Sequence, residues 1–337
     1  MEALFYEKLA DQKVRCHLCN HRCVINENGF GRCKVRQNIK GVLETLIYSR
    51  LVAINPDPIE KKPLYHVMPG SLAYSIGAAG CNFRCAFCQN AEISQMPRES
   101  GRMGEHVFSA ADIIDDALKN NCRSIAYTYT EPTVNFEFCY DTAVLARAKG
   151  LKNIFVTNGY MTTEAIDMIA PFLDAANVDL KSFNDDFYRD LCEARLEPVK
   201  ENLRYLHQKG VFLEVTTLLI PGKNDDETEL RNMARFLVDA LGPETPWHIS
   251  RFHPTYRLLD VSPTPVGLLT RARDIGLESG LKYVYIGNVH GHPGENTFCA
   301  QCGELIVERS GFFNIKQYRI ENGRCAYCGA LINGLDM

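Results

Sequence analysis

The chain has 337 residues, of which 46% are hydrophobic, so it is long enough to bury one large core and carry small appended segments. Its formal net charge of −4 and its pI of about 6.2 argue against a nucleic-acid binder or a protein drawn to anionic membranes. No apolar run approaches the roughly 18 residues of a membrane span, and the start of the chain lacks the regions of a signal peptide. These features predict a cytoplasmic protein with no membrane or nucleic-acid partner.

Most of the 14 cysteines fall into three closely spaced sets. In a cytosolic chain of this length, such density indicates metal sites rather than disulfides. The isolated Cys122, Cys139 and Cys192 are interpreted as buried small hydrophobic residues. The three sets are Cys16, Cys19, Cys23 and Cys33; Cys81, Cys85 and Cys88; and Cys299, Cys302, Cys325 and Cys328.

Residues 1–42 form the first predicted segment, which carries the pattern C-x2-C-x3-C-x9-C. Four thiolates in so short a stretch can close a tetrahedral zinc site or hold an auxiliary iron–sulfur cluster. The paired Cys16 and Cys19 favour zinc, but the sequence leaves both metals open.

Residues 43–70 follow as a connector whose four prolines exclude a helix and predict an extended path. The connector is either a simple linker or a segment that lines the approach to the site described below. In the second interpretation, the lining residues are Lys61, Lys62, Tyr65 and His66.

Strands and helices alternate through residues 71–290. Seven strands separated by single helices imply right-handed crossovers and parallel pairing. The fold class is therefore α/β, a partial (β/α) barrel with its site at the carboxyl ends of the strands. The expected strands cover residues 72–77, 124–130, 153–157, 176–180, 212–220, 247–252 and 283–286, and the expected helices begin at Ser109 and then cover about 136–149, 163–173, 199–209, 227–241 and 266–279.

A CxxxCxxC loop directly follows the first of these strands and contains Cys81, Cys85 and Cys88. Three close thiolates can hold three irons of a cubane 4Fe-4S cluster, because soft sulfur ligands suit iron. No fourth cysteine lies in the same loop, so the fourth iron is free to bind a substrate or cofactor. An open metal position is typical of a catalytic site.

Residues 291–337 change character and contain two C-x2-C-G pairs, a pattern with a strong metal signature. A zinc ribbon and a rubredoxin-like single-iron site share this ligand set. Zinc is favoured, because a segment of this size is too small to fold on its own core and metal binding supplies folding free energy.

The CxxxCxxC loop, with aromatic Phe87 before its third cysteine, resembles the radical S-adenosylmethionine (radical SAM) enzymes, and the strand ends resemble those of pyruvate formate-lyase activating enzyme. The resemblance implies that Cys81, Cys85 and Cys88 are catalytic cluster ligands. It also implies that SAM binds at the free iron and is cleaved to a 5′-deoxyadenosyl radical. The residues predicted to bind this cofactor are Phe87, Thr130, Glu131, Asn158, Asp179 and Lys181.

The strand-end motifs give these residues separate expected roles. Tyr129-Thr130-Glu131-Pro132 stands where the family has Gly-Gly-Glu-Pro, so Glu131 is expected to accept hydrogen bonds from the SAM ammonium. Asn158 is expected beside the ribose. Asp179 and Lys181 point to the same side of a strand, where they bind the polar end of SAM, pair with each other, or help to hold a cation. Strand alternation also predicts that the side chains of His248, Arg251 and His253 face the substrate, with the alternative that Arg251 and His253 are held in the core or on its rim.

Taken over its length, the chain resembles the AmmeMemoRadiSam-type radical SAM proteins, which are similar to glycyl-radical activating enzymes. The motifs are CxLCxxxC near the start, PDPIEKKPLYHxxPG, GCNFRCAFCQN and the terminal CxxCG pairs. The resemblance implies that the substrate is a protein or peptide, or else a small molecule. It also implies Memo-like and AMMECR-type partner proteins and a reductant such as flavodoxin or ferredoxin. The alternative is a metal-stabilised scaffold or electron-transfer protein that binds a partner through its four-cysteine segments.

Overall fold

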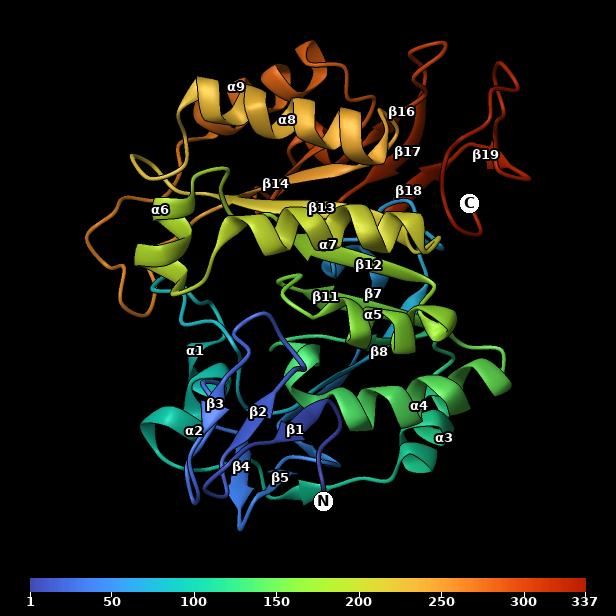
Figure 1. Ribbon diagram of the computed structural model, residues 1–337. Coiled ribbons are helices and arrows are strands. Elements are labelled where there is room, and N and C mark those ends of the chain that lie inside the picture. The colour runs from blue at the N-terminus through green and yellow to red at the C-terminus, as the bar shows by residue number, and fades with distance from the viewer.

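The computed structural model describes residues 1–337 and is built around one eight-stranded sheet with the order β15-β14-β13-β12-β11-β10-β8-β7 (Figure 1). Seven of these strands are parallel, which confirms the predicted α/β class with a mostly parallel sheet. The parallel strands are β8 (Leu72–Gly77), β10 (Ser124–Tyr127), β11 (Lys152–Thr157), β12 (Ala175–Asp179), β13 (Phe212–Leu219), β14 (Trp247–Arg251) and β15 (Val284–Gly287).

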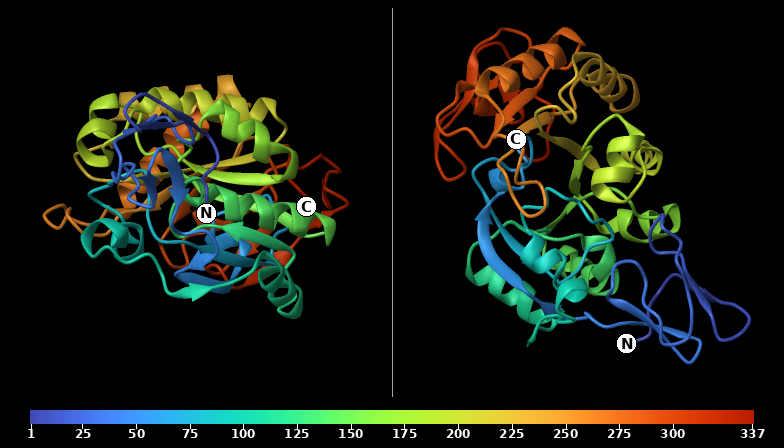
Figure 2. Two further views of the ribbon diagram at one scale, coloured as in Figure 1. Left: turned by 60° about the horizontal axis from the view of Figure 1, so that its bottom comes forward. Right: turned by 90° about the vertical axis from the view of Figure 1, so that its left-hand side faces the viewer.

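The helices of the crossovers cover the outer side of the curved sheet (Figures 1 and 2). Helix α3 shows why they form: Ser109 and Asp112 make a capping box at its start, and Ile113, Ile114 and Ala117 are buried. The crossover helices are α3 (Ala110–Lys119), α4 (Phe136–Ala148), α5 (Thr163–Ile169), α7 (Leu196–Gln208), α8 (Glu227–Leu241) and α9 (Val266–Glu278), and the short helices are α1 (Ala91–Ser94), α2 (Met96–Glu99) and α6 (Asp185–Phe187). None of these helices is long and apolar enough to cross a membrane.

The proline-rich connector contributes an eighth strand that the sequence did not predict. Strand β7 (Ala53–Pro58) pairs antiparallel with β8 at the edge of the sheet. An edge strand tolerates Pro56 and Pro58, because one of its sides needs no N–H donors. The chain then turns into the barrel, where Ile59, Leu64, Val67 and Met68 pack against Ala73, Ala126, Ile154 and Ala175 of the parallel strands. The connector therefore closes the amino end of the barrel.

The N-terminal segment forms small antiparallel sheets that pack at the carboxyl ends of the barrel strands. The Asn20 amide donates to the Tyr160 carbonyl at 3.0 Å, just beyond β11, and Cys19 forms an isolated bridge with Met161. The paired strands are β1 (Tyr6–Lys8), β2 (Val14–Cys16) and β3 (Val24–Ile25), and β4 (Arg36–Ile39) with β5 (Val42–Thr45). A further short pair, β6 (Arg50–Leu51) and β9 (His106–Val107), lies outside this segment.

The C-terminal segment packs at the other end of the barrel. The Met68 amide donates to the Leu335 carbonyl and the Leu335 amide donates to the His66 carbonyl, each at 2.8 Å. Its strands are β16 (Thr297–Phe298), β17 (Leu305–Arg309), β18 (Ile315–Tyr318), β19 (Ile320–Glu321) and β20 (Arg324–Cys325). The two cysteine-rich segments thus lie at opposite ends of the barrel strands, and Figure 2 shows them well separated.

Candidate functional site

The CxxxCxxC loop lies between β8 and α1, at the carboxyl end of the barrel. Cys85 is buried, whereas Cys81 and Cys88 are half-buried. The Phe83 amide donates to the Cys81 Sγ at 3.3 Å, and the Cys88 Sγ lies 3.2 Å from the Ser94 hydroxyl. Such donors stabilise thiolates, which are the form of cysteine that binds iron.

Burial raises the pKa of Cys81 well above its usual value, and the negative charges of Glu131 and Cys85 add to this effect. A thiolate at this position therefore needs a positive partner. Metal ligation provides one, because a bound cation favours the deprotonated thiol. The electrostatics of the loop fit an iron–sulfur cluster.

Two asparagines connect the cysteine loop to the end of β11. The Asn158 Nδ2 donates to the Asn82 Oδ1 at 2.7 Å and lies 3.8 Å from the Cys81 Sγ. The Asn82 Nδ2 is buried and has no hydrogen-bond partner. A buried donor without a partner is costly, so this atom beside Cys81 fits a bound group that accepts a hydrogen bond.

Glu131 is buried after β10, and its carboxylate faces the end of β11. Its Oε1 accepts hydrogen bonds from the Thr133 amide, the Thr133 hydroxyl and the Thr157 hydroxyl, and its Oε2 accepts one from the Asn158 amide at 2.8 Å. Burial raises the pKa of Glu131, although these donors oppose the shift. The carboxylate holds Asn158 in place and keeps acceptor capacity on Oε2 for one further donor.

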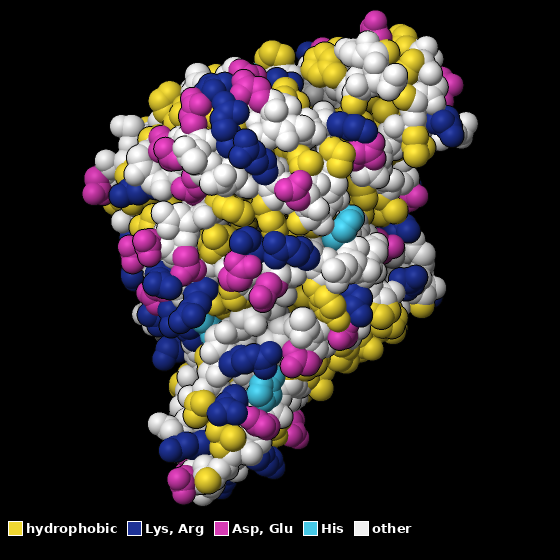
Figure 3. Space-filling model, turned by 45° about the horizontal axis from the view of Figure 1, so that its top comes forward, with side chains coloured by type: hydrophobic (Ala, Val, Ile, Leu, Met, Phe, Trp, Pro, Cys, Tyr) yellow, Lys and Arg dark blue, Asp and Glu magenta, His cyan; other side chains and the backbone are white.

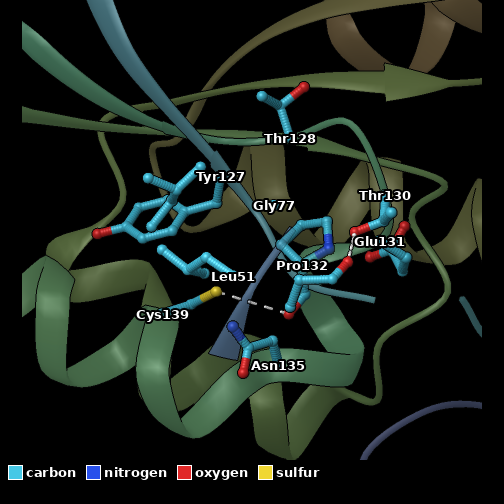
Figure 4. A pocket seen from close by; sticks show the side chains of 11 residues that line it. Leu51, Gly77, Tyr127, Thr128, Thr130, Glu131, Pro132, Asn135 and Cys139 are labelled. Carbon is cyan, nitrogen blue, oxygen red and sulfur yellow. Dashed lines mark hydrogen bonds between the residues drawn. The ribbon is translucent and has the colours of Figure 1, made fainter. Parts of the chain in front are cut away.

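Thr130 and Tyr129 fill the positions where the related motif has two glycines. The Thr130 hydroxyl donates to the Ala78 carbonyl at 2.6 Å, and Figure 4 shows Thr130 and Glu131 at one edge of a small cavity beside α4. Tyr129 has a φ of 64°, in the left-handed region that favours glycine. Its hydroxyl donates to the Asp57 carboxylate at 2.6 Å, which anchors the ring to β7.

Asp179 and Lys181 pair with each other, which was one of three outcomes left open by the sequence. The Lys181 Nζ lies 2.8 Å from the Asp179 carboxylate and 5.9 Å from the centre of the Phe87 ring. Burial lowers the pKa of Lys181, but the Asp179 carboxylate and the nearby Cys85 thiol outweigh it and raise the pKa. A charged pair therefore lies against the cysteine loop at the end of β12.

Cys192 is a neighbour of the site that the sequence did not identify. The Arg84 amide donates to the Cys192 carbonyl at 3.0 Å, and the Ala86 amide donates to the Leu191 carbonyl at 2.8 Å. A hydrogen bond with the buried Cys192 thiol lowers the pKa of Cys85. No local pattern indicates this contact, because the two cysteines are far apart in the sequence.

His248 does not face the mouth of the barrel as expected. Its Nε2 lies 2.5 Å from the Glu214 carboxylate, which also accepts hydrogen bonds from the Tyr65 and His66 amides. These residues form a buried network in the amino half of the barrel, so Tyr65 and His66 do not line the approach to the cysteine loop. The Arg251 guanidinium donates to the Thr264 carbonyl, and His253 is exposed.

The C-terminal cysteines gather as a compact set. Their sulfurs all lie within 4.8 Å of one another, with 3.6 Å between Cys299 and Cys328 and 3.8 Å between Cys302 and Cys325. Burial opposes ionisation of Cys299, but the Cys302 and Gln301 amides donate to its sulfur and lower its pKa to about 7. A tetrahedral ion with metal–sulfur distances of about 2.3 Å needs sulfurs about 3.8 Å apart, so this set fits one ion.

The N-terminal cysteines lie near one another. The Arg32 amide donates to the Cys23 Sγ at 3.5 Å, and the Arg36 guanidinium lies 3.9 Å from the Cys16 Sγ. Burial raises the pKa of Cys19, and the charges of the other three cysteines of the set raise it further. The four thiols therefore interact with one another.

The face shown in Figure 3 carries basic and acidic side chains interspersed rather than a basic stripe. On α8 and α9, Arg271 pairs with Glu227 at 2.7 Å and with Glu278 at 3.0 Å. Arg231 pairs with Glu278 at 2.9 Å. These arginines of α8 and α9 are therefore paired with carboxylates on this face.

Residues 75–234 match the family described as the Radical SAM superfamily. The chain is 48% identical over 334 residues to the uncharacterized protein MJ0808 of Methanocaldococcus jannaschii, with 98% of each chain covered. It is 23% identical over 175 residues to the pyruvate formate-lyase-activating enzyme of Listeria monocytogenes, covering 50% of this chain and 70% of the relative. It is 22% identical over 218 residues to the pyruvate formate-lyase 1-activating enzyme of Escherichia coli, covering 61% and 89%.

Among solved structures, Streptococcus suis SuiB bound to S-adenosylmethionine is similar, with a TM-score of 0.51 and 13% identity over 68% of this chain and 55% of SuiB. SuiB bound to its precursor peptide SuiA gives a TM-score of 0.50 at 13% identity, over 62% and 47%. At these identities the likeness shows the fold alone. The matched residues form a radical SAM superfamily domain with distant similarity to the pyruvate formate-lyase activating enzymes. The identity over nearly the whole length shows that the chain belongs to one family with the M. jannaschii protein.

Proposed function

We propose that the protein is a radical SAM enzyme whose Cys81, Cys85 and Cys88 hold a catalytic 4Fe-4S cluster. The observation that carries this proposal is the loop itself: three thiols at the carboxyl end of the barrel beside the buried, unpartnered Asn82 Nδ2. When bound, the cluster supplies the electron that cleaves SAM to a 5′-deoxyadenosyl radical, which abstracts hydrogen from the substrate.

The residues around the loop have separate roles in this proposal. Phe87 and Lys181 border the cofactor beside the cluster, with Lys181 held by Asp179. Glu131 and Thr130 act mainly by positioning, because their hydrogen bonds fix the turn at Asn158 and the start of the cysteine loop at Ala78. The remaining acceptor capacity of the Glu131 Oε2 suits a donor such as the SAM ammonium.

The substrate is proposed to be a protein or peptide, or less favourably a small molecule. Two of the similar proteins are named activating enzymes of pyruvate formate-lyase, and SuiB is described with a bound precursor peptide. Within the superfamily, the sequence motifs support assignment to the AmmeMemoRadiSam type. The proposed partners are Memo-like and AMMECR-type proteins, the proposed reductant is flavodoxin or ferredoxin, and the proposed location is the cytoplasm.

The chain is proposed to divide into residues 1–42, 43–70, 71–290 and 291–337. In this division the barrel carries the reaction and the two outer segments bind metal. The compact sulfurs of Cys299, Cys302, Cys325 and Cys328 support one zinc ion, or a single iron, in the last segment.

Anaerobic reconstitution with iron and sulfide, followed by reduction with SAM, tests the proposed chemistry. The protein is expected to form 5′-deoxyadenosine, and Cys85→Ala is expected to abolish it. Cys122→Ala is the matched control, because Cys122 is also buried but lies away from the loop. Product from Cys85→Ala, or a reducible cluster that never binds SAM, contradicts the proposal.

A further inference from the structure

The turn after β10 has a tyrosine at a position where the related motif has a glycine. Tyr129 has a φ of 64°, in the left-handed region that residues other than glycine rarely adopt. A glycine would adopt this conformation without steric cost. A tyrosine stays there only if its other contacts outweigh the strain, so the contacts of Tyr129 show what holds the turn.

The side chain of Tyr129 is anchored by the proline-rich connector. Its hydroxyl donates to the Asp57 Oδ2 at 2.6 Å and accepts from the Asn55 Nδ2 at 3.1 Å, and both partners lie on β7. Burial raises the pKa of Tyr129 to about 12, and the bond to Asp57 adds to the shift. The hydroxyl therefore keeps its proton for this bond at neutral pH. Gly77 leaves room for the ring, because a Cβ there would lie 3.2 Å from two carbons of Tyr129.

The Asp57 carboxylate is itself held by two lysines of the connector. Its Oδ1 accepts from the Lys61 Nζ and its Oδ2 from the Lys62 Nζ, each at 2.9 Å. The Lys62 Nζ also donates to the Ser75 hydroxyl at 2.5 Å, and the Lys62 side chain is 2% exposed. Burial raises the pKa of Asp57, but the hydrogen bonds from Tyr129 and the two lysines outweigh it and lower the pKa. Asp57 is therefore a fixed, charged acceptor for the Tyr129 hydroxyl.

The backbone of the same turn reaches the cysteine loop and the candidate SAM site. The Tyr129 carbonyl accepts from the Asn90 Nδ2, just after the cysteine loop, at 2.7 Å. The hydroxyl of the next residue, Thr130, donates to the Ala78 carbonyl at 2.6 Å, and Glu131 follows. Rotation about φ at Tyr129 would redirect the chain after it, so the conformation of this one residue determines where Thr130 and Glu131 lie.

We propose that Asp57 is a positioning residue that holds Tyr129 in the left-handed conformation and thereby fixes the turn that presents Glu131 to SAM. The connector then acts on the cofactor site through Tyr129 rather than by touching the cofactor. The SAM part rests on the proposed function, whereas the anchoring of Tyr129 by Asp57 does not.

An anchored tyrosine and a glycine reach the same turn by different means. Glycine has no Cβ, so the left-handed region costs it little, whereas tyrosine depends on its bond to Asp57. Removing the bond alone is expected to release the turn, but replacing the whole side chain by a hydrogen atom is not. This difference separates anchoring from the simple loss of a contact.

Equilibrium dialysis of labelled SAM against the reconstituted protein tests the proposal, with the cluster signal recorded before SAM is added. Tyr129→Phe, which removes only the hydroxyl, is expected to weaken SAM binding about tenfold while the SAM-free cluster signal stays unchanged. Tyr129→Gly is expected to bind SAM within about threefold of the wild type. Tyr129→Ala is the matched control, because it loses the same contacts but keeps the Cβ, and it is expected to bind about tenfold less tightly than Tyr129→Gly.

Asp57→Asn tests the connector, because it keeps the shape of the side chain but draws its one oxygen to the lysines. Alone, it is expected to weaken SAM binding about fivefold. Combined with Tyr129→Gly it is expected to change binding little, since no hydroxyl remains to be held. Lys61→Ala is the control, because the 43% exposed Lys61 contacts the other carboxylate oxygen.

Three results overturn the proposal. These are equal SAM binding by Tyr129→Gly and Tyr129→Ala, wild-type binding by Tyr129→Phe, and an effect of Asp57→Asn that persists unchanged in combination with Tyr129→Gly.

Thermal unfolding of the full-length protein without added SAM tests the anchor by itself. Tyr129→Gly is expected to melt at a higher temperature than Tyr129→Ala, the reverse of the usual order, because only glycine tolerates a φ of 64°. A higher melting temperature for Tyr129→Ala overturns the anchoring. If the wild type binds no SAM but this order holds, the proposed function and the SAM part fail while the anchoring stands.

Discussion

The two four-cysteine segments lie at opposite ends of one barrel and are held together differently. The C-terminal segment has a separate core of six buried residues, of which Cys299 and Cys325 are themselves metal-ligand candidates. The N-terminal residues Cys16, Leu18 and Ile25 instead belong to the 67-residue core of the barrel. The proposed metal site therefore supplements a small separate core at the C-terminal end, whereas at the N-terminal end the barrel supplies the core.

Each segment also meets the barrel through a histidine. His21 contacts the Asn82 carbonyl of the cysteine loop. His66, in the connector, lies 2.6 Å from both the Asn333 carbonyl and the Tyr285 hydroxyl. Burial lowers the pKa of each histidine to about 4, so both contacts are made by a neutral ring.

The largest expected effect is the loss of the C-terminal fold without its ion. Cys299→Ser with Cys325→Ser removes two ligands and leaves four residues of the separate core. Binding of a structural zinc contributes an apparent ~10–16 kcal/mol, which a core of this size does not replace. Limited proteolysis is expected to cut residues 291–337 rapidly while the barrel stays intact.

Cys122→Ser serves as the control, since Cys122 is buried but belongs to none of the three cysteine sets. The same double substitution at the N-terminal end, Cys16→Ser with Cys23→Ser, is expected to leave its segment far more resistant, because the barrel core still holds it. Equal proteolysis of both segments contradicts the contrast between them.

The second prediction concerns the buried ion pair that joins the N-terminal segment to α4. The guanidinium of Arg36 contacts the Glu137 carboxylate, and the two side chains are 1% and 2% exposed. Arg36→Met leaves the buried carboxylate without its cation and with only the Leu4 amide as a donor, which is expected to cost about 3–5 kcal/mol in the free energy of unfolding. Urea denaturation measures this loss, and Arg36→Met combined with Glu137→Leu is expected to recover part of it.

The parts of the molecule that the sequence predicted are those set by local patterns. Alternating apolar runs and capping residues such as Ser109 predicted the seven parallel strands and their helices to within a few residues. Strand β7 was missed because its prolines argue against a strand, and only its place at the sheet edge makes them acceptable.

In the candidate site, too, local patterns predicted only the residues that stand in short motifs. The three cysteines, Glu131 and Asn158 stand in recognisable local motifs at strand ends. Cys192 reaches Cys85, and Glu214 binds the connector amides, only through the closure of the barrel. The partners in these contacts are far apart in the sequence, so no residue spacing predicts them. The expected substrate role of His248 was wrong because its side chain instead binds Glu214, which is also far away in the sequence.

The third prediction is a loss of stability on acidification, centred on His66. Its pKa is about 4 in the folded protein and ordinarily 6.5. Between these values the unfolded chain binds a proton that the folded chain does not, so stability falls as the pH drops from 6.5 towards 4. The expected contribution is about 3 kcal/mol.

Denaturation curves at several pH values measure this dependence. His66→Gln keeps a donor and an acceptor but cannot titrate, so its stability is expected to fall less steeply across this range. His21→Gln is the matched variant at the other end of the barrel, and its slope is expected to decrease by a similar but smaller amount, since His21 is less deeply buried. Unchanged slopes in both variants contradict the assigned pKa values.

The smallest expected effect comes from a second ion pair at the N-terminal interface. Arg32 lies 2.6 Å from Glu193, with side chains that are 34% and 37% exposed. Arg84, in the cysteine loop, lies 3.2 Å from the same carboxylate. Glu193→Gln is expected to cost less than about 1 kcal/mol in the free energy of unfolding, because water screens exposed pairs, and high salt is expected to remove the difference.

This pair and the one between Arg36 and Glu137 both tie the N-terminal segment to the barrel, so measuring both variants in the same urea series separates the effect of burial from that of charge. A cost for Glu193→Gln as large as that of Arg36→Met would mean that the N-terminal interface depends on charge pairing in general rather than on its buried core.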